Sequence, residues 1–233
     1  MELIWQGLVQ AVQMVFAGDR ELYQVAWLTV RVTGTATLLS IIFGVPLGAL
    51  LGLSSFPGRR GVQSLLNSTL GLPPVVVGLW VSLLLWRSGP LGFLRLMYTP
   101  TALIVAQVLI AMPRVAALTM AGVMQVDQGL SAQLRGLGAN RWQTVWLVIR
   151  ESQLSIMAAC LAGFGAVVAE VGAAMAVGGN IRGQTRILST AIVLEVNRGN
   201  FALALALSFV LMTFTYVVAM VLTMMQQRRH PHA

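Results

Sequence analysis

Glu170 and Arg114 lie in apolar stretches, where a charge needs either a partner or a function. Glu170 is the only carboxylate deep inside a long apolar run, and Arg114, directly after Pro113, is a guanidinium in a similar setting. At the centre of a bilayer such a charge costs about 2.5–3.5 kcal/mol or more, so each is a functional candidate if these runs cross a membrane. Our hypothesis is that Glu170 is a structural or gating residue, hydrogen-bonded or paired with Arg114.

The chemistry that the chain lacks is equally informative. Its formal net charge of +8 comes from 15 arginines, and it contains no lysine. A P-loop needs a lysine to reach nucleotide phosphates, so any ATP hydrolysis that drives this protein belongs to a partner that binds ATP and Mg²⁺. We therefore expect neither enzyme activity nor a cofactor in this chain itself. Cys160, His230 and His232 do not form a metal-ligand set.

The composition indicates an integral membrane protein. The chain is 57% hydrophobic and 9% charged, with a mean hydropathy of +0.81, whereas a soluble domain has roughly 25% charged residues. Arginines that flank membrane spans face lipid phosphates, which explains the basic charge better than nucleic-acid binding does. A hydrocarbon core of ~30 Å requires about 20 apolar helical residues. Five stretches reach that length, at about residues 25–53, 62–86, 101–124, 154–177 and 201–225.

The first segment differs from these spans. Within residues 1–18 polar side chains recur at helical spacing, at Glu2, Gln6, Gln10 and Gln13. Apolar residues fill the other side, as in a helix that lies in the membrane interface. The segment lacks the basic start and the cleavage site of a secretory signal. The sequence thus predicts an all-α membrane protein, a single domain over residues 1–233 with five transmembrane helices and an N-terminal interfacial helix.

A polar segment at residues 130–151, between the third and fourth spans, is much longer than the usual connection of about 4–6 residues. Gly138 interrupts a short helical stretch, Asn140 can cap a second one, and Trp142 and Trp146 recur on one side of that second helix. Exposed aromatic residues often anchor partner proteins. We therefore interpret the segment as a cytoplasmic docking site; an ordinary interhelical loop is the alternative.

At this segment the sequence resembles the coupling loop of bacterial ATP-binding-cassette importer permeases. That loop starts with Glu-Ala-Ala, reaches a glycine after three residues, and ends nine residues later in Ile-x-Leu-Pro. When Gly138 is aligned with that glycine, neither the glutamate nor the final proline is present. The resemblance implies ATPase contacts from Ala132, Gln133, Leu134, Gly138, Ala139, Arg141 and Trp142.

Two further segments resemble the oxyanion branch of this family. The first carries Pro73, Pro74 and Gly78, which suit a bent, thin helix beside a pathway, although a plain structural kink is the alternative. The second spans 169–195 and resembles the molybdate and tungstate permeases, most closely the tungstate-uptake subgroup. Its matching residues are Glu170, Gly172, Gly178, Gly179, Asn180, Ile181, Gly183 and Thr185. We expect Pro73, Pro74, Gly78, Arg114, Glu170, Gly179 and Asn180 to form the pathway or its gate.

The resemblance also implies an assembly and an orientation. It implies a type I importer fold in the bacterial inner membrane, with an extracytoplasmic N-terminus and a cytoplasmic C-terminus. The arginines are divided almost evenly between the two sides, so charge alone does not fix this orientation. Expected partners are a second copy, two cytoplasmic ATPases, an extracytoplasmic oxyanion-binding protein and membrane lipid, without nucleic acid. Tungstate is the expected substrate, then molybdate, and sulfate is not excluded.

Two other classes compete with this interpretation. A proton-coupled secondary transporter could use Glu170 as its carrier, but such transporters carry internal repeats, and we find none. A membrane scaffold without transport activity would not require a glycine-rich span that carries a buried carboxylate. The proton-coupled transporter also leaves the long 130–151 segment without a role.

Overall fold

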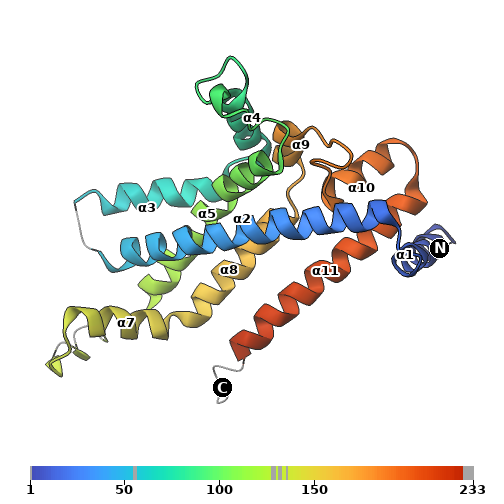
Figure 1. The fold of residues 1–233 in the computed structure, drawn as a ribbon. Coiled ribbons are helices and arrows are strands. Elements are labelled where there is room, and N and C mark those ends of the chain that lie inside the picture. The colour runs from blue at the N-terminus through green and yellow to red at the C-terminus, as the bar shows by residue number, and fades with distance from the viewer. Residues whose placement is uncertain (1, 55–56, 127–129, 131–132, 135, 228–233) are drawn as a thin grey trace. The chain divides into compact units, whose positions relative to one another are not determined.

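The computed structural model describes residues 2–54, 57–126, 130, 133–134 and 136–227. All regular structure in these residues is helical, which confirms the predicted all-α class (Figure 1). The longer helices are α1 (Glu2–Phe16), α2 (Arg20–Leu53), α3 (Arg59–Ser68), α4 (Pro74–Leu85), α5 (Pro100–Gln125), α7 (Arg141–Glu151), α8 (Gln153–Val168), α9 (Gly172–Gly178), α10 (Leu188–Asn197) and α11 (Phe201–Gln227). Ala132, His230 and His232, which the sequence analysis singled out, lie outside the described residues.

Three helices, α2, α5 and α11, are long and apolar enough to cross a membrane unaided. Two further helix pairs, α3 with α4 and α7 with α8, are each bent at a break, by 99° and 61°. By length and composition alone they raise the number of candidate spans to at most five, and only if α7 is counted with α8. At about 1.5 Å per residue, the 26 residues of α5 already exceed a ~30 Å hydrocarbon core. Pro46 and Pro113 stay inside their helices, as spans packed among other helices allow.

The breaks divide two of the stretches that look continuous in the sequence. The stretch at 62–86 becomes α3 and α4, because Pro73 has an extended backbone and Pro74 occupies the first position of α4. A residue before proline is disfavoured in the helical conformation, so the chain leaves the helix there. The stretch at 154–177 becomes α8 and α9, and the chain between them includes Glu170.

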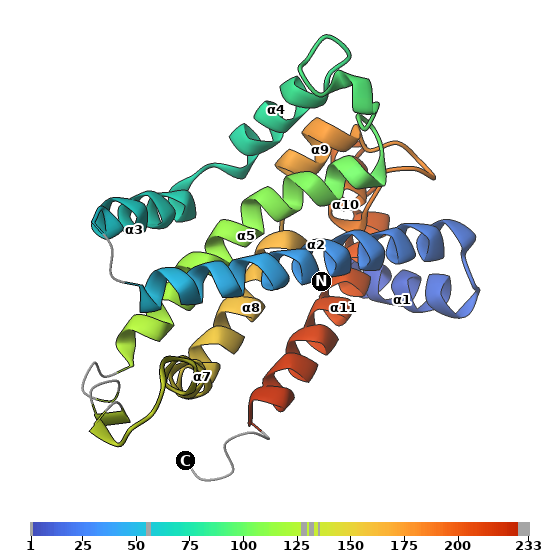
Figure 2. The same ribbon diagram turned by 60° about the vertical axis from the view of Figure 1, so that its left-hand side comes forward.

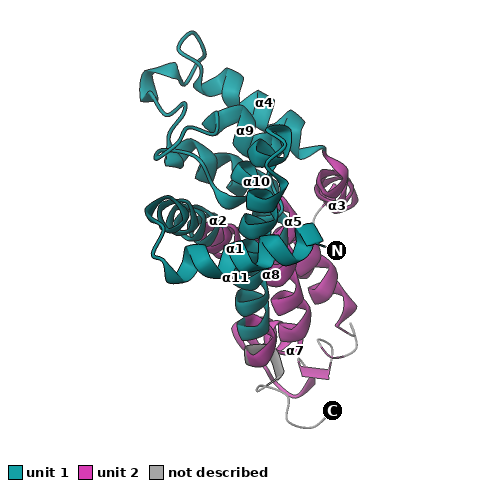
Figure 3. Cartoon of the chain, turned by 90° about the vertical axis from the view of Figure 1, so that its right-hand side faces the viewer, with its two compact units in different colours: residues 1–36, 73–110, 165–221 teal, residues 37–72, 111–164, 222–233 magenta. Residues whose placement is uncertain are grey.

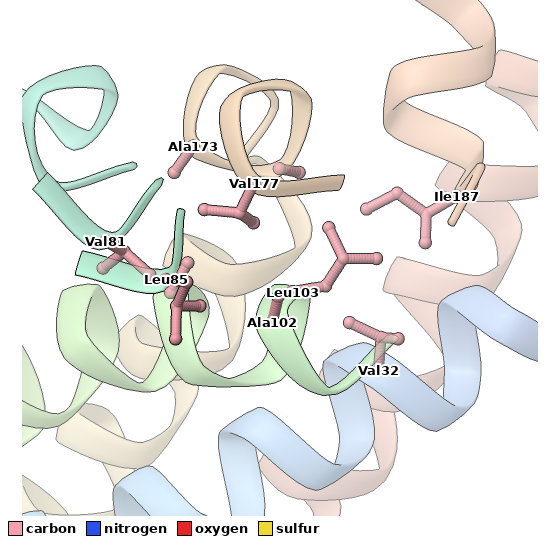
Figure 4. Packing of buried hydrophobic residues seen from close by; sticks show 10 residues of the cluster. Val32, Val81, Leu85, Ala102, Leu103, Ala173, Val177 and Ile187 are labelled. Carbon is pink, nitrogen blue, oxygen red and sulfur yellow. The ribbon is translucent and has the colours of Figure 1, made fainter. Parts of the chain in front are cut away.

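The chain forms two compact units (Figure 3). The first contains residues 1–36, 73–110 and 165–221, and the second contains 37–72, 111–164 and 222–233. The main core of the first unit joins α4 and α9 with the first part of α5 and with α2 (Figure 4). Its buried members are Val32, Val81, Leu85, Ala102, Leu103, Ala106, Ala173, Ala174, Val177 and Ile187. Four of the ten are alanines, and such small side chains let membrane helices approach closely.

In the first unit, α1 packs against α11 and lies beside the start of α2. Gly7 of α1 lies against Leu205 of α11, and the turn at Gly18, with a positive φ of 68°, folds α1 back beside the start of α2 (Figure 2). Asp19 then caps α2, because its Oδ1 accepts the Leu22 N–H at 2.8 Å. The other side of α1 exposes Trp5 and Phe16, and the position of α1 at the membrane surface stays a prediction.

In the second unit, α2 packs on α5 through a row of glycines. Gly44, Gly48 and Gly52 recur every fourth residue and lie against the α5 backbone or its valines. In α8, Gly163 lies against Val115 of α5. A glycine on every turn of one face brings two helix backbones together, which is the usual way that membrane helices gain van der Waals contact.

Candidate functional site

The 130–151 segment has an ordered turn at its centre. Gly138 takes a positive φ of 86°, and the Ala139 N–H donates to the Leu134 carbonyl at 2.9 Å. This is the hydrogen bond of a helix end that is closed by a left-handed glycine. Gln133 and Leu134 belong to the helical turn before it, with Gln133 exposed and Leu134 half-buried. The predicted interruption of the helix at Gly138 is confirmed.

Asn140 starts α7 with a reciprocal pair of hydrogen bonds. Its Oδ1 accepts the Gln143 N–H at 2.9 Å, and its own N–H donates to Gln143 Oε1 at 2.8 Å. Such a capping box satisfies two N–H groups that would otherwise have no partner at a helix start. The predicted cap is therefore confirmed, and Arg141 and Trp142 stand in the first turn of a well-started helix.

One side of α7 is open and the opposite side is anchored. Trp142 is 83% exposed and Trp146 is 59% exposed, and the Arg150 guanidinium lies 5.3 Å from the centre of the Trp146 ring. Val148 is buried against Ala49 of α2 and Val123 of α5. An exposed aromatic surface on an anchored helix is available for contact with a partner protein or with lipid. Sequence reasoning missed Val148, because a single valine in an apolar pattern carries no signal for its partners.

The junction between α7 and α8 is a bend at a buried serine. The two helices are bent by 61° at Ser152, which is buried and donates its hydroxyl to the Val148 carbonyl at 2.8 Å. Beside it is a cavity of about 540 Å³ lined by Gly122, Gln125, Val126, Leu130, Gln133, Glu151, Ser152 and Ser155. A second one, of about 400 Å³, is lined by Leu137, Gly138, Ala139, Gln143, Trp146 and Leu147. The described part of the segment thus combines an exposed aromatic surface with two cavities.

The predicted pathway residues Pro73, Pro74 and Gly78 lie in and before α4, which packs on α9. Gly78 is buried against Ala173 of α9, and a side chain at Gly78 would overlap the Ala173 backbone. Gly172 at the start of α9 lies in turn against Val75 of α4. Pro73 and Pro74 fix where α4 begins, so the paired prolines set the position of Gly78 opposite α9.

Glu170 caps α9. Its side chain is 6% exposed, and its Oε1 accepts the Ala173 N–H at 2.7 Å. Its backbone carbonyl accepts the Ser189 hydroxyl at 3.2 Å. A carboxylate at a helix N-terminus satisfies an N–H group and interacts favourably with the helix dipole. Arg114 is half-buried in the other compact unit, so its pairing with Glu170 stays a prediction.

Gly179 and Asn180 end α9 in a hydrogen-bonded loop. Both have a positive φ, of 66° and 51°, and the Gly179 position contacts the ring of Tyr98. The Asn180 amide donates to the Thr190 carbonyl at 3.3 Å. The Tyr98 N–H donates to the carbonyl of Val177, the second residue before Gly179, at 3.1 Å. Sequence reasoning missed Tyr98 because its contacts join distant parts of the chain.

No group of three or more His, Cys, Asp or Glu side chains that could hold a metal ion occurs in the part of the chain that the structure describes. The chemistry available at these sites is hydrogen bonding, aromatic contact and close helix packing. Together with the apolar spans, this indicates a helical membrane protein.

The chain belongs to the family described as the binding-protein-dependent transport system inner membrane component, which matches residues 44–231. It is 36% identical to the tungstate uptake system permease protein TupB of Peptoclostridium acidaminophilum, over 97% of this chain and 100% of that protein. Its identity to the TupB of Campylobacter jejuni is 31%, over 93% and 90% of the two chains. The molybdenum transport system permease protein ModB of Escherichia coli is 28% identical over 73% and 78%.

The fold comparison agrees with this family. The inward-facing MetNI methionine ABC transporter matches 90% of this chain and 94% of its own, with a TM-score of 0.68 and 19% identity. The permease fold that was predicted from the 130–151 segment is thereby confirmed, as is membership of the importer permeases for oxyanions. The chain is a multi-pass subunit of the inner membrane and not an enzyme.

Proposed function

We propose that this chain is the permease subunit of an ATP-driven importer for a tetrahedral oxyanion, with tungstate as its substrate and molybdate as the next candidate. The tungstate permeases to which it is 36% and 31% identical support this substrate. Two copies enclose the pathway, and an extracytoplasmic binding protein delivers the anion. Specificity rests mainly in that binding protein, because a permease needs sites weak enough to release what enters.

The observation that carries the proposal is the exposed, capped helix α7, because an importer without a nucleotide site must receive energy through a contact. We assign α7 and the turn before it to the groove of a cytoplasmic ATPase, with one ATPase for each copy. Val148 joins α7 to α2 and α5, and the bend at Ser152 joins it to α8. A displacement of α7 by the ATPase therefore acts on three helices together.

The gate in this proposal is the α4–α9 pair with the loop that follows α9. The close contact of Gly78 with Ala173 makes the pair move as one body, and α5, which packs on both, continues into the unit that holds α7. The C-terminus lies on the same, cytoplasmic, side as α7, and the N-terminus is extracytoplasmic. This orientation places the ATPase and the binding protein on opposite sides of the membrane.

The proton-carrier alternative assigns a different role to Glu170. A carrier has to load and release a proton at each cycle, so its carboxyl group must be free to exchange partners. Glu170 Oε1 is instead held by the Ala173 N–H at the start of α9. This hydrogen bond favours a structural role in the gate.

Co-purification tests the docking assignment. The chain is co-expressed with its partner ATPase, and retention of the ATPase is measured for Trp142→Ala and for the matched control Trp27→Ala, since Trp27 is also exposed, at 69%. Loss of an aromatic anchor from a protein interface costs at least about 2 kcal/mol, a factor of about 30 in affinity. We expect W142A to release the ATPase and W27A to retain it. Equal retention by the two variants contradicts the assignment.

A further inference from the structure

A further cavity of about 540 Å³ lies in the first compact unit, and no residue of α4 or α9 lines it. It is framed by α1, the start of α2, α10, the start of α11 and the chain after α9. Sites for small molecules typically have about 300–1,000 Å³, so its size suits a ligand. Its floor is apolar and is formed by Met14, Leu22, Val25, Ala191, Leu203 and Leu207.

The rim of the cavity is charged but formally neutral. Three arginines, Arg182, Arg186 and Arg198, stand with three carboxylates, Asp19, Glu21 and Glu195. Glu21 pairs with Arg182 and, at 3.4 Å, with Arg186. Arg198 pairs with Glu195 at 2.9 Å, and the Asn200 amide donates to the same carboxylate at 3.1 Å. Such a rim offers hydrogen-bond donors and acceptors side by side, so it suits a ligand that carries both a positive and a negative charge.

One donor in this cavity has no acceptor among the residues that the structure describes. The Arg186 side chain is 14% exposed, and its Nε is buried without a hydrogen-bond partner. A buried N–H group without an acceptor is unfavourable, and a charged donor most of all. Glu21 engages Arg186 through Nη1, and Nε is buried without an acceptor, so an oxygen of a ligand reaches Nε when the guanidinium turns toward the cavity.

The surroundings of the cavity place it at the level of lipid head groups. Trp5, Tyr23 and Trp27 are exposed on α1 and on the first turns of α2, and the Tyr23 hydroxyl donates to the Val15 carbonyl. Tryptophan and tyrosine are enriched at the membrane–water interface. Membrane lipid is present at this level at high concentration. The apolar floor of the cavity suits the acyl chains of a lipid, and the charged rim suits its head group.

We propose that this cavity binds the head group of a zwitterionic phospholipid of the phosphoethanolamine type. The phosphate accepts hydrogen bonds from Arg186 and its neighbour Arg182, the ammonium group faces Glu195 and Asp19, and an acyl chain covers the apolar floor. A free inorganic dianion fits less well, because carboxylates equal in number to the arginines line the rim and the floor offers it no contact. This proposal concerns α1 and its anchoring, and it is independent of the transported substrate.

The test uses the full-length chain purified in mild detergent. Native mass spectrometry counts and identifies the retained lipid, and the delipidated protein is then titrated with phosphatidylethanolamine or phosphatidylglycerol. Arg186→Gln removes the donor that lacks a partner, Arg186→Lys keeps the charge but not Nε, and Arg87→Gln is the matched control outside the cavity. A lost charge-assisted hydrogen bond weakens binding by about tenfold or more, so we expect this loss in both Arg186 variants and not in R87Q.

The head-group preference separates a lipid from a free anion. Glu195→Gln should abolish the preference for phosphatidylethanolamine over phosphatidylglycerol and leave phosphate binding. Melting temperatures of the delipidated variants, measured in parallel, identify any variant that has not folded. If R186Q has not folded, lipid binding by R186K tests whether Nε of Arg186 is needed. A wild-type chain that retains no phosphatidylethanolamine, or that binds both lipids equally, overturns the proposal. So does release of the bound lipid by millimolar tungstate.

Discussion

Gly78 of α4 lies against Ala173 of α9 so closely that a β-carbon on the glycine would overlap the alanine backbone. Each residue belongs to a short helix on the far side of a break in an apolar stretch. Two short helices in contact at their backbones move together, since separation loses their shared burial without any compensating contact. The pair therefore behaves as one element of the proposed gate.

Gly78→Val should destabilise the protein and abolish transport. The added side chain has no space beside Ala173, and overpacking of this kind costs about 1–3 kcal/mol. Thermal unfolding in detergent and anion uptake by vesicles measure the two effects.

The control for this substitution is Gly165→Val in α8, where a β-carbon meets no atom within 4 Å. It should fold as the wild type does. If G78V and G165V melt at the same temperature and transport equally well, the backbone contact of α4 with α9 is not the constraint that we infer.

Asn140→Ala should weaken the coupling to the ATPase without disturbing the spans. The variant loses the side-chain acceptor of the Gln143 N–H, which costs a helix start about 1 kcal/mol. Amide hydrogen exchange over residues 141–144 should accelerate, and ATPase retention should fall.

Asn140→Asp is the informative control, because aspartate caps a helix start as well as asparagine does. N140D should restore the slow amide exchange of residues 141–144 and the retention of the ATPase. Fast exchange in N140D, or unchanged retention in N140A, would show that α7 does not depend on its capping box for binding.

Glu170 variants separate a helix cap from a proton carrier. Glutamine retains an oxygen that can accept the Ala173 N–H, so Glu170→Gln should keep most of the transport. Alanine retains none, and a buried N–H group without a partner costs about 1–3 kcal/mol. Glu170→Ala should therefore transport poorly and melt at a lower temperature. Complete loss of transport in E170Q, with an unchanged melting temperature, would instead indicate a carrier of protons.

Local chemistry made part of this structure predictable. Gly138 and Asn140 end one helix and start the next through bonds that span only a few residues, so their residue types suffice to locate the turn. The consecutive prolines Pro73 and Pro74 likewise indicate a break. The long apolar stretches identify spans for the simpler reason that a bilayer requires about 20 such residues.

The remaining features depend on contacts between distant residues. The anchor of α7 through Val148 needs Ala49 and Val123, and the loop after α9 needs Tyr98. The pairing of Glu21 with Arg182 joins residues 161 positions apart. A single sequence gives no indication of such pairs, because valine, tyrosine and arginine occur in many apolar or interfacial settings.

The central claim is that this permease receives its energy through α7 from a separate ATPase. It is tested most directly by tungstate uptake into vesicles that contain the chain, its partner ATPase and the binding protein. We predict accumulation that requires ATP and that W142A abolishes while W27A preserves it. Accumulation of tungstate without ATP, by vesicles that contain this chain alone, would contradict the account.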